Sequence, residues 1–192
     1  MHEIDLADEI VLEASPDGDS TLELDVPELD LGEDNLALRA LRALERRVGR
    51  DLPTHIRIAK RIPAGGGLGG GSSDATAVIR GANRLHGLGL GVRVMEEVAA
   101  EVGSDTAFFV RGGTALCRGR GEVVSPVADP RRLYFLLLLP GISVPTGPVF
   151  GELRLPVRSR EGYALLRRLG WNQALKPGDP ALFNRLEAPA RA

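Results

Sequence analysis

Three short stretches early in the chain are expected to be β-strands, and the second and third alternate apolar and polar residues, as half-buried strands do. They cover residues 9–13, 21–26 and 55–60. The segment Ser-Pro-Asp-Gly-Asp at 15–19 is typical of a turn. We therefore expect the first two strands to form an antiparallel hairpin.

Helical spacing of apolar residues follows a candidate N-cap at Asp34-Asn35 and predicts a helix that ends at Gly49. The same spacing predicts helices over 75–85 and 92–102. Further along, residues 106–110 and 114–117 are expected to be extended, with a Gly112-Gly113 turn between them. A central strand is expected at 133–139 and a short helix at 163–169.

Composition narrows the class of protein. The 192 residues carry 24 basic and 26 acidic side chains, and this net charge of -2 argues against a nucleic-acid partner. The single cysteine, Cys117, excludes an internal disulfide framework and a cysteine-rich zinc site. The apolar runs are too short to span a bilayer, and the acidic start of the chain is unlike a signal peptide. We expect a cytoplasmic protein with no membrane partner.

The most informative segment lies between the third strand and the second helix. Six glycines occupy the seven positions from 65 to 71, interrupted only by Leu68. Glycine permits positive φ and close approach, so successive backbone N–H groups and the following helix start can surround a phosphate. The candidate nucleotide-binding residues are Pro63, Ala64, Gly65, Gly66, Gly67, Leu68, Gly69, Gly70, Gly71, Ser72, Ser73 and Asp74.

Three other interpretations of the glycine loop fit less well. A flexible linker needs neither an apolar residue at its centre nor a strand and an amphipathic helix beside it. The dinucleotide-binding pattern expects an acidic residue about 20 positions on, where Leu90 stands. A P-loop would continue with Gly-Lys-Ser or Gly-Lys-Thr, which is absent here.

Residues 62–75, Ile-Pro-Ala-Gly-Gly-Gly-Leu-Gly-Gly-Gly-Ser-Ser-Asp-Ala, resemble the nucleotide-binding motif of the GHMP kinase superfamily. The stretch from 67 onward is similar to the branch that phosphorylates the 2-hydroxyl of 4-diphosphocytidyl-2-C-methyl-D-erythritol in non-mevalonate isoprenoid biosynthesis. The resemblance implies an alcohol phosphotransferase that uses ATP and Mg²⁺, although it assigns no metal ligand. It also implies an α+β fold: a mixed domain like domain 2 of ribosomal protein S5, then an incomplete ferredoxin-like domain.

Two further segments support the resemblance. Residues 103–110 resemble a family segment whose aspartate accepts the proton of the attacking hydroxyl, so Asp105 is the candidate catalytic base. Taken alone, an aspartate after glycine is more typical of a turn. Residues 140–146 resemble a stretch whose threonine lies near the transfer site, so Thr146 is a candidate substrate-binding residue; a helix cap explains it equally well. Lys60 matches a basic family position, and the resemblance allows it to lie near the nucleotide, but such a lysine is more often a solvated strand end.

The match implies a nucleotide-binding domain over residues 1–130 and part of a second domain over 131–192. Two family segments, one with a lysine that assists the aspartate and one with a substrate-binding histidine, have no counterpart. We therefore expect a truncated form, as a monomer or a homodimer. The alternatives are another GHMP small-molecule kinase, a catalytically impaired nucleotide-binding fragment, and an α+β domain whose glycine loop is only a linker.

Overall fold

The computed structural model describes residues 1–26, 32–127, 134–139, 149 and 151–152. The chain divides into two compact units, Met1–Gly141 and Ile142–Ala192. Thr146 and the helix predicted at 163–169 lie outside the described residues. The assignment of a second domain to 131–192 stays a prediction.

Three strands of the described residues form a mixed sheet in the order β1-β3-β2. Strand β3 (Thr54–Ala59) lies in the middle, antiparallel to β1 (Glu9–Ala14) and parallel to β2 (Thr21–Leu24). The predicted β1–β2 hairpin is therefore wrong. The chain does turn after β1, but the alternating pattern identifies a strand without identifying its partner, and β3 takes the position between the two.

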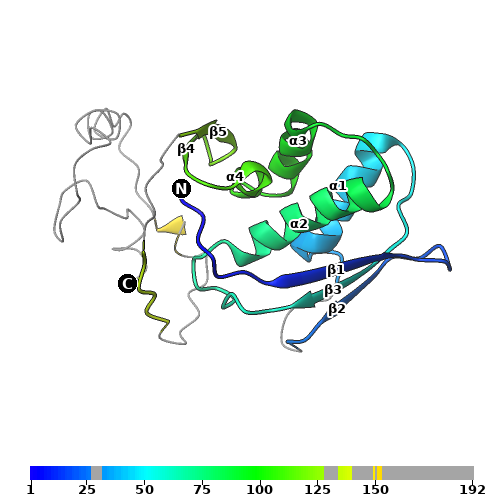
Figure 1. Cartoon of the computed structure of the whole chain (residues 1–192), viewed down its shortest axis with the longest axis horizontal. Coiled ribbons are helices and arrows are strands. Elements are labelled where there is room, and N and C mark those ends of the chain that lie inside the picture. Colours follow the sequence, from blue (N-terminus) through cyan, green and yellow to red (C-terminus); the bar gives the residue numbers. More distant parts are fainter. Residues whose placement is uncertain (27–31, 128–133, 140–148, 150, 153–192) are drawn as a thin grey trace. The chain divides into compact units, whose positions relative to one another are not determined.

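One face of this sheet packs against the helices (Figure 1). On β3, Thr54, Ile56 and Ile58 are buried on that face. Ile56 is paired with Leu12 of β1 and Leu22 of β2, so the inward side chains of the three strands line up. This register places the end of β3, and the glycine loop that follows it, at one edge of the helical layer.

Four described helices complete the unit: α1 (Leu36–Val48), α2 (Gly70–Leu85), α3 (Val92–Val102) and α4 (Thr106–Arg111). Helix α1 begins and ends as predicted, since Asn35 Oδ1 accepts the N–H of Ala37 at 2.9 Å and Gly49 has φ 70°. Helix α2 begins earlier than the apolar pattern suggested, inside the glycine segment. None of the helices within the described ranges is long and apolar enough to cross a membrane.

The expectation of an extended segment at 106–110 is wrong, because these residues form α4. Its short apolar run fits either structure, and the helix buries Ala107, Phe108 and Val110 together. The second extended segment is confirmed as β4 (Ala115–Arg118), which pairs with β5 (Val123–Pro126), a strand missed in the sequence.

The central strand expected at 133–139 is also not found. Residues 134–139 carry no strand pairing, and Tyr134, Leu136 and Leu138 are 84–89% exposed. A continuous apolar run predicts burial only if a layer covers it, and among the described residues none covers these three side chains.

Candidate active site

The glycine loop connects the end of β3 to the start of α2. Gly65, Gly67 and Gly69 have φ of 69°, 71° and 73°, so left-handed backbone recurs at every second position. Such alternation can turn neighbouring N–H groups toward one point, where they favour an anion. Gly69 is also the N-cap of α2, and having no side chain it leaves the first N–H groups of the helix without a side-chain acceptor.

A pocket of about 310 Å³ lies along one side of this loop. We call it the glycine-loop pocket. Residues 63–71 form one wall, and Leu24, Leu36 and Ile58 supply apolar surface opposite. Asn35, Lys60 and Asp74 also line it. A site with backbone donors on one wall and apolar surface on another suits a ligand that has a charged group and a flat organic group.

A second pocket, of about 400 Å³, is also lined by part of the loop, together with Asp105. We call it the Asp105 pocket. Ser73, Phe108 and Phe109 line it together with residues from the N-terminal segment, which is residues 1–7. Ile62, Gly67, Leu68 and Gly69 line both pockets. These four residues are therefore shared by the two cavities, and we call them the shared wall.

The position of Asp105 is fixed by contacts around the start of α4. The hydroxyl of Thr76, on α2, donates to the carbonyl of Thr106 at 2.8 Å and so ties the two helices together. Gly121 has φ 129°, and a Cβ there would lie 2.8 Å from Asp105 Oδ1. Glycine at 121 thus allows the chain to pass beside the carboxylate, which itself is exposed.

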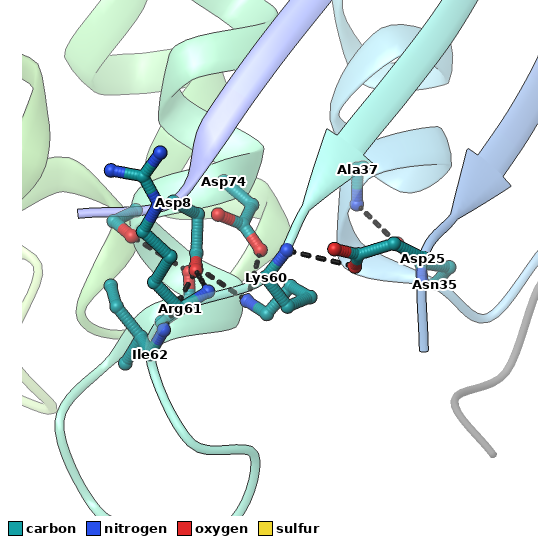
Figure 2. A network of polar contacts seen from close by, with 10 residues as sticks. Asp8, Asp25, Asn35, Ala37, Lys60, Arg61, Ile62 and Asp74 are labelled. Atoms are coloured by element: carbon teal, nitrogen blue, oxygen red, sulfur yellow. Dashed lines mark hydrogen bonds and ion pairs between the residues drawn. The ribbon is translucent and has the colours of Figure 1, made fainter. Parts of the chain in front are cut away.

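Figure 2 shows an ion-paired group of three side chains at the base of the glycine loop, which we call the Lys60 cluster. It consists of Asp8, Lys60 and Asp74. Lys60 Nζ donates to Asp8 Oδ2 at 2.6 Å and to Asp74 Oδ2 at 2.7 Å. All three side chains are at most 8% exposed.

Burial and pairing shift the three pKa values differently. Burial acts to raise the pKa of Asp8, but the backbone N–H of Ile62 and the Lys60 ammonium hold it below its usual value. Burial acts to lower the pKa of Lys60, yet its bonds to the two carboxylates raise it. For Asp74, burial and the neighbouring charge of Asp8 outweigh Lys60 and raise the pKa to about 6.

The structure brings most of the predicted site residues together. Residues 63–71 and Asp74 line the glycine-loop pocket, Ser73 and Asp105 line the other, and Ser72 lines neither. The expectation that Lys60 is a solvated strand end is wrong, because its side chain is buried and ion-paired with two carboxylates. Asp8 was missed, since an acidic residue before a strand carries no pattern in the sequence.

The described residues do not form a metal site of their own. Within the described ranges, no group of three or more histidine, cysteine, aspartate or glutamate side chains could hold a metal ion. The protein donors of the glycine loop are mainly backbone N–H groups, which attract anions.

Comparison with known proteins agrees with this geometry. Residues 35–113, which include α1, the glycine loop and Asp105, match the family model described as the GHMP kinases N terminal domain. The chain also superposes on a crystal structure of 4-(cytidine 5'-diphospho)-2C-methyl-D-erythritol kinase with a TM-score of 0.65 at 32% identity, covering 96% of this chain and 64% of that one. The fold and the glycine loop thus define the GHMP kinase class.

Sequence relatives narrow the class. Over its whole length the chain is 39% identical to the 4-diphosphocytidyl-2-C-methyl-D-erythritol kinase of Synechococcus sp. (strain CC9902), of which it covers 67%. Over 81% of its length it is 41% identical to the kinase of the same name from Shouchella clausii (strain KSM-K16), of which it covers 52%. The chain belongs to the 4-diphosphocytidyl-2-C-methyl-D-erythritol kinase family, and it spans about half to two thirds of the length of these relatives.

Proposed function

We propose that this chain carries the phosphate-binding and proton-accepting parts of a kinase that transfers the γ-phosphoryl group of ATP to the 2-hydroxyl of 4-diphosphocytidyl-2-C-methyl-D-erythritol. The observation that carries the proposal is the shared wall. Ile62, Gly67, Leu68 and Gly69 line both a pocket suited to a nucleotide and a pocket that holds a carboxylate. The names of the relatives supply the acceptor alcohol.

On the donor side, the glycine-loop pocket matches the parts of ATP. The N–H groups of the loop and of the first turn of α2 face the phosphates, where the helix dipole also favours negative charge. The apolar side chains of Leu24, Leu36 and Ile58 give the adenine ring a surface to lie against. Mg²⁺ comes to the site with the phosphates of ATP, as it commonly does in phosphotransferases.

On the acceptor side, Asp105 takes the proton of the attacking hydroxyl. A carboxylate within hydrogen-bond reach of an alcohol can act as the base of phosphoryl transfer. Phe108 and Phe109 line the same pocket and give it apolar surface. The substrate-binding role of Thr146 remains part of the proposal, on its sequence resemblance alone.

A second candidate function is nucleotide binding without efficient transfer. The chain has only two lysines, Lys60 and Lys176, and the ammonium of Lys60 is engaged by two carboxylates. No other lysine lies in the described part of the chain to assist Asp105. A third candidate, a GHMP kinase for another alcohol, shares the donor pocket and differs only in the acceptor.

The proposal also includes a cytoplasmic location, a monomeric or homodimeric state and a small-molecule substrate in place of a nucleic acid. The net charge of -2 supports the last point.

The test is ADP release by the purified chain with ATP, Mg²⁺ and 4-diphosphocytidyl-2-C-methyl-D-erythritol. Asp105→Asn should lower turnover by about 100-fold or more, the range of general-base catalysis, while the Kd of ATP changes less than about twofold. The matched control is Asp51→Asn, which removes an exposed carboxylate outside both pockets.

The outcomes separate the candidates. Turnover that Asp105→Asn retains would contradict the role of Asp105. ATP binding without turnover on any alcohol would favour the second candidate. Turnover on homoserine or mevalonate in preference to the named substrate would favour the third.

A further inference from the structure

The Lys60 cluster joins the two ends of the glycine loop, and the proposed chemistry makes no use of it. Lys60 itself is the last residue before the loop segment. Asp8 Oδ1 accepts the backbone N–H groups of Arg61 and Ile62 at 2.5 and 2.8 Å, and so holds the beginning of the loop. Asp74 lies on α2, just past the end of the loop. One ammonium group therefore bridges both ends.

Lys60 is poorly placed to bind phosphate directly. Its side chain is 8% exposed, and its ammonium lies within 2.7 Å of a carboxylate oxygen on each side. With both aspartates ionised, the cluster carries a net charge of -1. A lysine that served an anionic ligand would not be offset by two buried carboxylates, so its contribution is to the shape of the loop.

One carboxylate oxygen of Asp74 is in an unfavourable environment. Its Oδ2 is bound to Lys60, while its Oδ1 is buried with no hydrogen-bond partner in the described part of the chain. A buried carboxylate oxygen without a donor is unfavourable, and such groups are rare in folded proteins. Gly70 allows the close packing, because a Cβ there would lie 3.0 Å from Ile62 and 3.4 Å from Lys60 Nζ.

We propose that Lys60 and Asp74 are positioning residues, which set the spacing between the two ends of the glycine loop and so form the phosphate cradle before ATP arrives. The identity of the ligand as ATP rests on the proposed function, whereas the positioning role rests on the contacts of the Lys60 cluster. A cradle fixed in advance binds more tightly, because the ligand does not have to order the loop.

Hydrogen exchange of the ligand-free full chain tests the loop directly, in peptides that cover residues 63–73. Asp74→Asn keeps an oxygen for Lys60, so exchange should stay within about twofold of the wild type. Asp74→Ala removes the tie, so exchange of the loop should rise about tenfold while β1 and β3 remain protected. Arg61→Met is the matched control, because it removes a neighbouring cation that is 66% exposed and, within the described residues, paired with the exposed Glu9.

Asp74→Glu is a second variant, which tests the proposal even if Asp74→Ala does not fold. It keeps the charge but lengthens the tie by one methylene. If spacing is what matters, the glutamate variant also raises exchange of the loop, and the Kd of ATP rises about tenfold in parallel. Wild-type exchange in the glutamate variant would overturn the proposal, and so would equal exchange in the asparagine and alanine variants.

Equilibrium dialysis with ATP and Mg²⁺ separates this proposal from the proposed function. If the wild-type chain does not bind ATP, the proposed function fails, and the exchange data still decide whether the cluster holds the loop. If the alanine variant binds ATP more weakly while its loop stays protected, Asp74 contacts the ligand and the positioning role is wrong.

Discussion

Two separate features of the structure require glycine at position 69. Its φ of 73° is in the left-handed region, which an alanine adopts at a cost of roughly 1–2 kcal/mol. A Cβ at this position would also lie 3.1 Å from the ring of Phe109. The glycine is thus needed both for the turn into α2 and for the close approach of the loop to the Asp105 pocket.

Replacement of two glycines separates these requirements. Gly67 has nearly the same φ, 71°, but nothing lies within 4 Å of a Cβ there. Gly67→Ala should lower the free energy of unfolding by about 1 kcal/mol, from backbone strain alone. Gly69→Ala should cost about 1–2 kcal/mol more, because Phe109 must shift. Urea unfolding of both variants measures the difference, and equal losses would show that the contact with Phe109 has no energetic weight.

Residue chemistry made part of the site predictable. Six glycines in seven positions, between a predicted strand and a predicted amphipathic helix, indicate a phosphate-binding loop, because a linker would need neither neighbour. Asp105 was predictable only through its resemblance to a family segment. Asp8 was not, because its partners at residues 60–62 are more than 50 positions away in the sequence.

At the scale of elements, three segments converge on the Lys60 cluster. Asp8 precedes β1, Lys60 follows β3, and Asp74 belongs to α2. The side-chain oxygen of Asp25, just after β2, accepts the backbone N–H of Lys60 at 2.9 Å. The ends of all three strands of the sheet are therefore joined at the point where the glycine loop begins (Figure 2).

This cluster makes stability depend on pH. The pKa of Asp74 is about 6 in the folded chain and near 3.8 when unfolded, so the folded chain takes up the proton first as pH falls. The contribution of Asp74 to stability is therefore present at low pH and lost as pH rises through 6. Between pH 7.5 and 5.0, the wild type should gain stability relative to Asp74→Asn.

Urea unfolding of the two proteins at each pH measures this gain. His86, whose pKa is lowered mainly by burial, has the opposite effect on the pH dependence of stability. Because His86 is present in both proteins, its effect cancels in the difference between their free energies of unfolding. A constant difference across the range would show that Asp74 does not titrate there.

Element types were largely predictable, whereas their partners were not. Periodicity and end signals identified α1, α3 and the three strands of the main sheet, because each buries one face. The predicted β1–β2 pairing was wrong because both strands pair instead with β3, which comes later in the sequence. Leu22 of β2, for example, lies beside Ile56 of β3. Residues 106–110 were misassigned because a run this short fits a strand as well as a helix.

At the scale of the whole molecule, one compact unit contains both pockets. Met1–Gly141 includes the sheet, the four helices α1 to α4 and the N-terminal segment that lines the Asp105 pocket. His2 of that segment pairs with Thr114 beside β4, so the start of the chain is joined to the β4–β5 sheet. The glycine-loop pocket and Asp105 therefore belong to a single folded unit.

The central claim is that the glycine loop separates the nucleotide from the acceptor. Backbone amide NMR of the ¹⁵N-labelled 20.5 kDa chain tests it most directly. ATP with Mg²⁺ should shift amides of the glycine-loop pocket, including Asn35 and Lys60, and the acceptor should shift Phe108 and Phe109. Both ligands should shift Gly67 and Gly69, which belong to the shared wall. Two ligands that shift the same single set of amides would contradict the account.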